Sequence, residues 1–72
     1  MNITKGLYKA LESKYFADIE DAKVRMSIYF EKSVAIGEHP QHTEEMDKLL
    51  GQIAHAEDNL NALKKYFNEY DN

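Results

Sequence analysis

The strongest constraint on the fold is an apolar or aromatic residue at every third or fourth position in the second half of the chain. Its members follow alternating spacings of three and four without a break: Met46, Leu49, Ile53, Ala56, Leu60, Leu63, Phe67 and Tyr70. A strict seven-residue repeat of this kind predicts a helix whose apolar stripe packs in a left-handed coiled coil.

The first half of the chain carries a matching stripe. It runs through Tyr15, Ile19, Ala22, Met26, Tyr29, Ser33 and Ile36, and we expect it to continue toward the N-terminus at four-residue steps through Leu11, Leu7 and Ile3. The two stripes predict helices over about residues 2–36 and 40–70, joined by a turn at 37–39. Gly37 suits the end of the first helix and Pro40 the start of the second.

Folding the chain back on itself at Glu38 matches the two stripes by size. Ala22 then lies opposite Ile53, and Ile19 opposite Ala56, so that a small residue meets a large one at each central layer. At the far end we expect Leu7 and Tyr8 near Phe67 and Tyr70. The predicted fold is therefore a single all-α domain over residues 1–72, an antiparallel two-helix coiled-coil hairpin.

A second apolar row predicts that the hairpin self-associates into a helical bundle. The first helix carries it at Ala10, Ala17, Val24, Ile28 and Ala35, and the second helix adds Leu50 and Ala54. A helix that is apolar on two sides is buried on two sides. A 72-residue chain without cysteine also gains little stability from its own core alone. We expect a homodimeric four-helix bundle ahead of larger rings or a bundle with a different protein.

Composition and motifs exclude several function classes. The net charge is −4 and no basic stripe is present, which argues against binding to duplex nucleic acid. No apolar run reaches the roughly 18 residues that a membrane span requires, and the N-terminus lacks the core of a signal peptide. No set of nucleophile, base and acid stands at a spacing known for catalysis, so we expect no enzyme.

The candidate ligand-binding residues are cations, tyrosine and the polar residues of the turn. They are Arg25, Tyr29, Lys32, Glu38, His39 and His42. Cations and tyrosines from two subunits would form a pocket for a phosphorylated small molecule, and free N–H groups at the start of a helix favour an anion. Two histidines and one acid lack a third strong metal ligand, so we expect neither a metal nor a cofactor. The alternative is that these residues only build the turn.

The stretch VAIGEHPQHTEEMDKLLGQIAHAEDNLNALKKYF resembles a group of small proteins from tailed bacteriophages. The shared features are the turn Ile36-Gly37-Glu38-His39-Pro40, the pair Met46-Asp47 and the segment from Ile53 to Leu60. The resemblance implies a location in the cytoplasm of the infected bacterial host. In size and hairpin plan the chain is also similar to the anti-CBASS and Thoeris anti-defence sponges of phages.

This architectural similarity implies a non-enzymatic accessory protein that sequesters a small anionic, nucleotide-type immune signal. The alternative is a protein–protein interaction module, which inhibits a host protein or acts as an assembly adaptor. In the first case the expected partners are further copies of the chain and a nucleotide. In the second case the second apolar row binds a host protein.

Overall fold

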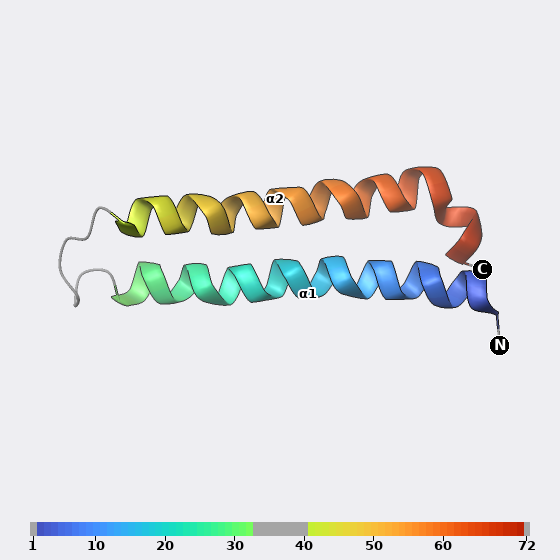
Figure 1. Cartoon of the computed structure of the whole chain (residues 1–72), viewed down its shortest axis with the longest axis horizontal. Coiled ribbons are helices and arrows are strands. Elements are labelled where there is room, and N and C mark those ends of the chain that lie inside the picture. The colour runs from blue at the N-terminus through green and yellow to red at the C-terminus, as the bar shows by residue number, and fades with distance from the viewer. Residues whose placement is uncertain (1, 33–40, 72) are drawn as a thin grey trace.

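Two long helices lie side by side in opposite directions. The computed structural model describes residues 2–32 and 41–71, which form α1 (Ile3–Lys32), α2 (Gln41–Phe67) and the short 3-10 helix η1 (Asn68–Asp71). Both chain termini lie at one end of the pair, here called the open end, and residues 33–40 join the helices at the other, connected end (Figure 1). The fold is the predicted all-α helical hairpin.

The helix ends follow from local capping and charge. Asn2 precedes α1, and its side-chain oxygen accepts a hydrogen bond from the backbone N–H of Lys5 at 3.2 Å, which is the geometry of an N-cap. Lys64 and Lys65 lie in the last turn of α2, where cations favour the negative end of the helix dipole. The α-helix ends at Phe67, three residues before the predicted end, because η1 tightens and turns toward α1. The predicted end of the first helix and the turn lie outside the described residues.

The core is the predicted contact between the two stripes. Ala22 has no exposed surface and Ala56 only 1%, so both alanines lie inside the contact between the helices. The other buried side chains are Tyr8, Leu49, Leu60 and Leu63. Around them, half-buried members of both stripes complete the contact: Tyr15, Ile19, Met26, Tyr29, Met46 and Ile53.

The N-terminal part of α1 differs from the sequence prediction. Leu7 is 64% exposed and Leu11 42%, whereas Tyr8 is only 4% exposed and Glu12 is half-buried. The reason is helical geometry, since each four-residue step advances the position by about 40° around the axis, and repeated steps leave the contact side. The alternating spacing instead continues backward from Tyr15 through Glu12 and Tyr8. Leu7 and Leu11, which were expected to be buried as part of the apolar stripe, are therefore exposed.

The hairpin is a rod that is one layer of helices thick. Its extents are 52 × 20 × 13 Å and its radius of gyration is 16.2 Å, against about 11 Å for a compact domain of this length. The side of each helix that faces away from its partner therefore contacts solvent. Neither described helix has a segment apolar enough to cross a lipid bilayer.

Candidate functional site

Three of the predicted ligand-binding residues lie in the last turns of α1. Arg25, Tyr29 and Lys32 are separated by four and three residues, which places them on one side of the helix. The Nε of Arg25 donates a hydrogen bond to Asp21 Oδ1 at 3.1 Å, and both side chains are more than half exposed. An exposed pair of this kind contributes at most about 1 kcal/mol, so a stronger anion could replace the aspartate.

Tyr29 and His42 connect the two helices near the connected end. Their ring centroids are 5.5 Å apart and the rings meet edge to face at 67°. The structure thus brings together one predicted residue from α1 and one from α2. Arg25 lies one helical turn before Tyr29 in α1. The other two predicted residues, Glu38 and His39, lie outside the described residues. Within residues 2–32 and 41–71, no three histidine, aspartate or glutamate side chains converge on a point where a metal ion could bind.

The residues predicted to form the oligomer interface fall on two sides of the hairpin. Positions two residues from a buried residue lie about 200° around a helix, on its opposite side. Ala10, Ala17, Val24 and Ile28 each stand in this relation to a buried or half-buried residue of α1 and form one exposed row, here called the outer row. Ala54 stands in the same relation to Ala56 and faces away from α1, while Leu50 lies on the flank of α2. Ala35 is outside the described residues.

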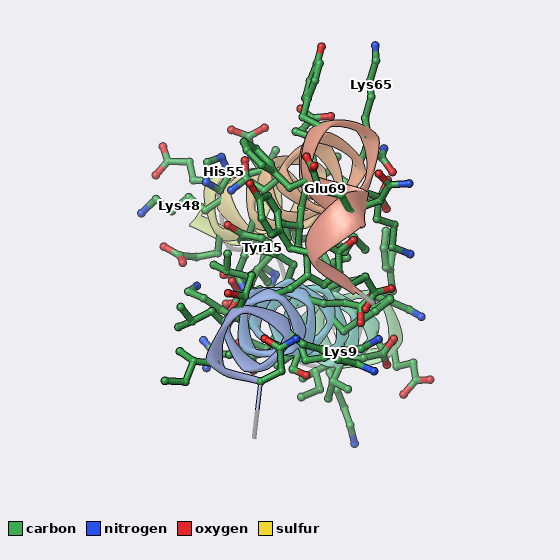
Figure 2. The ribbon with its side chains drawn as sticks, turned by 90° about the vertical axis from the view of Figure 1, so that its right-hand side faces the viewer. Lys9, Tyr15, Lys48, His55, Lys65 and Glu69 are labelled. Atoms are coloured by element: carbon green, nitrogen blue, oxygen red, sulfur yellow. The ribbon has the colours of Figure 1, made fainter. Side chains whose placement is uncertain are left out.

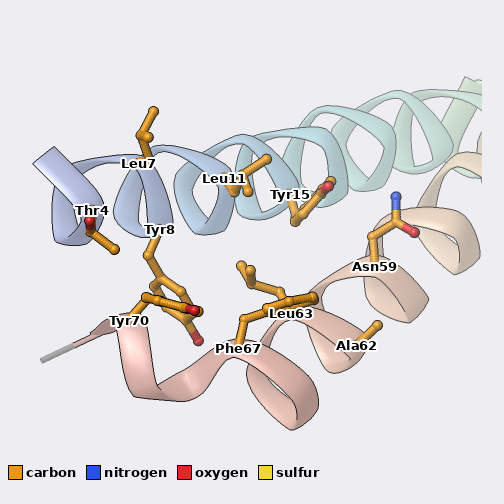
Figure 3. A pocket seen from close by; sticks show the side chains of 10 residues that line it. All are labelled: Thr4, Leu7, Tyr8, Leu11, Tyr15, Asn59, Ala62, Leu63, Phe67 and Tyr70. Carbon is orange, nitrogen blue, oxygen red and sulfur yellow. The ribbon is translucent and has the colours of Figure 1, made fainter.

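A pocket lies at the open end that was not predicted from the sequence (Figure 3). Leu7, Leu11 and Tyr15 line it from α1, and Leu63 and Phe67 line it from α2. Its volume is about 540 Å³. The aromatic residues gather at the open end as predicted, but they leave a hollow between them. The signal in the sequence was the cluster of tyrosine and phenylalanine near both termini, which predicts contact and says nothing of unfilled space.

A group of paired charges lies beside this pocket without lining it. Lys9 Nζ is 2.9 Å from Asp71 Oδ1 and 3.4 Å from Glu12 Oε1, and Lys64 Nζ is 4.0 Å from Glu12 Oε2. These pairs tie η1 and α2 to α1. In the view along the hairpin axis, Lys9 lies at the flank of α1 below the end of η1, while Tyr15 lies between the helices (Figure 2).

The same charges and the burial of Tyr8 change the pKa values of two groups at the open end. Burial raises the pKa of Tyr8, and the carboxylates of Asp71 and Glu12 raise it further, while Lys9 lowers it. Contact with Asp71 and then with Glu12 raises the pKa of Lys9. The Tyr8 hydroxyl therefore stays protonated to a more alkaline pH than an exposed tyrosine would.

The fold and these surfaces define an all-α helical hairpin with exposed apolar faces. Comparison with models of known protein families, with curated proteins and with solved structures finds no significant match to this chain.

Proposed function

We propose that this chain is a non-enzymatic binding module that works as a self-associated helical bundle. The supporting observation is the amount of surface that the hairpin leaves uncovered. Its accessible surface is 5645 Å², against about 4,600 Å² for a compact monomer of the same mass. The excess of about 1,000 Å² is close to the roughly 800 Å² that each partner contributes to a standard interface.

The outer row of α1 has the shape needed for contact with a second copy. Its N-terminal half carries Ala10 and Ala17, and its C-terminal half carries Val24 and Ile28, which are 58% and 53% exposed. When two α1 helices pair antiparallel about a two-fold axis, the small half of each row faces the large half of the other.

Charge near the centre of such an interface is balanced within each chain. Glu20 pairs with Lys23 at 3.2 Å, and Asp21 pairs with Arg25 at 3.1 Å. Each acid beside the two-fold axis is therefore neutralised by a cation of its own chain, so the equivalent acids of the two chains do not repel each other strongly. This arrangement favours a homodimer, built from four helices, over contact with an unrelated surface.

The double variant Val24→Lys/Ile28→Lys is expected to be monomeric. Both side chains are already exposed in the hairpin, so lysine costs little within one chain, but in the two-fold contact each lysine would be buried against the alanine half of the partner's row. Light scattering after size exclusion should give twice the 8.4 kDa chain mass for the wild type and 8.4 kDa for the variant.

The control is Thr43→Lys/Asn61→Lys, which adds the same charge at exposed positions of α2 and should keep the dimer mass. A wild type that stays monomeric up to high micromolar concentration contradicts the proposal, as does a double variant that retains the dimer mass. A monomer would leave a host protein as the partner of the outer row.

A small anion at the connected end is the second candidate function. It is favoured by the meeting of Tyr29 and His42 beside Arg25, because aromatic rings stack on nucleobases and a guanidinium binds phosphate. Together with the resemblance to phage proteins, this supports sequestration of a nucleotide-type immune signal.

Calorimetric titration with cyclic dinucleotides, cyclic trinucleotides and ADP-ribose derivatives tests this candidate. We expect binding by the wild type and an affinity about tenfold lower for Arg25→Gln, a loss of roughly 1.4 kcal/mol. Lys5→Gln removes an equal charge at an exposed position near the opposite end of α1 and should bind as the wild type does. No heat of binding across the panel would refute the candidate.

A further inference from the structure

We infer that the open-end pocket binds a small uncharged molecule with a flat apolar body, such as a substituted aromatic ring. None of its lining residues belongs to the outer row or to the group of Arg25, Tyr29 and His42, so it adds a second ligand class to the proposed binding module. Its walls come from α1, α2 and η1 together (Figure 3). It therefore exists only in the folded hairpin.

The size and lining of the pocket fit a small organic molecule. A volume of about 540 Å³ lies within the range of roughly 300–1,000 Å³ that is typical of ligand sites. Leu7, Leu11, Phe67 and Tyr70 are 42–64% exposed in the hairpin, so a ligand would remove a large apolar area from water.

The absence of charge in the lining selects an uncharged ligand. Every residue that lines the pocket in the described part of the chain is apolar, aromatic or neutral and polar. A charged ligand would lose hydration without gaining an opposite charge, which is costly at a partly buried site. The nearby ions do not change this, because Lys9, Glu12, Lys64 and Asp71 are engaged with one another.

The aromatic rings and the few polar groups of the lining would orient a ligand in the pocket. The rings of Phe67 and Tyr70 lie 6.5 Å apart at 30°, which presents stacked faces for a flat ligand. Tyr8 and Tyr70 project toward one another near one end of the pocket, and Asn59 lies at the other end (Figure 3). A ligand with an apolar centre and a hydrogen-bonding group at its edge matches this order.

The apolar lining is too short for a partner helix. On α1 it extends from Thr4 to Tyr15, or roughly 17 Å at the rise of an α-helix, in a rod 52 Å long. Charged residues flank the end of this lining, since Lys14 and Asp18 form an ion pair at 2.9 Å and the Lys14 ammonium lies 5.8 Å from the Tyr15 ring. A small molecule can fill this length, whereas a helix would extend onto the charges.

Binding of two matched fluorescent probes tests the inference. N-phenyl-1-naphthylamine is uncharged and apolar, and 1-anilinonaphthalene-8-sulfonate has a similar ring system with a negative charge. We expect the wild type to bind the uncharged probe saturably, at one molecule per chain, and to bind the sulfonate about tenfold more weakly. Equal binding of both probes, or no saturable signal from the uncharged one, would overturn the inference.

Three variants test where the probe binds. Ala62→Phe places a ring in the pocket from an exposed position of α2, and Asn61→Phe adds the same ring one residue away, outside the lining. We expect Ala62→Phe to weaken binding of the uncharged probe at least about tenfold and Asn61→Phe to leave it unchanged. Leu11→Gln, which changes the pocket without adding bulk, should weaken it as well. Circular dichroism confirms that each variant is helical.

Light scattering on the same samples separates this site from self-association. Ala62→Phe should keep the mass of the wild type, and Val24→Lys/Ile28→Lys should bind the uncharged probe as the wild type does, whatever its mass. If Ala62→Phe and Leu11→Gln instead reduce the mass while the wild type ignores the probe, a second copy fills the pocket and the inference is wrong. Failure of the outer row as an interface would leave this result unchanged.

Discussion

Leu60→Ala is expected to lose about 2–5 kcal/mol of unfolding free energy, because it opens a cavity in the centre of the hairpin contact. Leu60 is 8% exposed and belongs to the unbroken stripe of α2. A core of this size supplies about 3–5 kcal/mol in total. The variant should therefore be largely unfolded at room temperature, which circular dichroism and urea titration would show.

The matched control is Leu50→Ala, the same substitution on the same helix. Leu50 is 56% exposed, so within one chain the change should cost less than about 0.5 kcal/mol. The pair therefore measures burial with helix propensity held constant. Equal stability of the two variants would mean that the observed contact between α1 and α2 is not the one that holds the protein together in solution.

Ala22→Leu is expected to destabilise the hairpin by about 1–3 kcal/mol, through overpacking. Ala22 has no exposed surface and lies inside the contact between the helices, so three additional carbon atoms must push α2 away. Alanine and leucine have nearly equal helix propensities, which leaves the packing term dominant. Thermal unfolding followed by circular dichroism gives the change.

Ala17→Leu is the control for this prediction, since Ala17 is exposed on the outer row. At low protein concentration, where the monomer dominates, it should unfold within a few degrees of the wild type. If Ala22→Leu proves as stable as Ala17→Leu, the contact between the helices has room beside Ala22 and the packing described for this residue is incorrect.

Much of the fold was predictable because one stripe is complete. The repeat in α2 contains no polar interruption, and the buried residues Leu49, Ala56, Leu60 and Leu63 all belong to it. The pattern in α1 is interrupted by Glu12, so apolar spacing alone predicts Leu7 and Leu11 as the buried residues in its place. The aliphatic part of a glutamate can occupy a seam position while its carboxylate reaches Lys9 and Lys64.

The candidate site was predictable only in part. The spacing of Arg25, Tyr29 and Lys32 follows from helical periodicity, and the pair of Asp21 and Arg25 follows from their four-residue separation. The open-end pocket does not follow from any such rule. Its volume depends on the side-chain conformations of Tyr15 and Phe67 and on the bend of η1, which places Tyr70 against the space. Periodicity predicts which residues are neighbours, and leaves the gaps between them undetermined.

The antiparallel arrangement of the helices also predicts the order in which their contacts form during folding. The chain separation between contacting residues grows along the rod, from 13 for Tyr29 and His42 to 62 for Lys9 and Asp71. Closing the longer segment costs about 1.4 kcal/mol more entropy than closing the shorter one, so contacts should form first near the connected end and proceed toward the termini. The open-end pocket is then completed last in folding. The backbone amides of the residues that line it should exchange hydrogen faster than those in the middle of the hairpin.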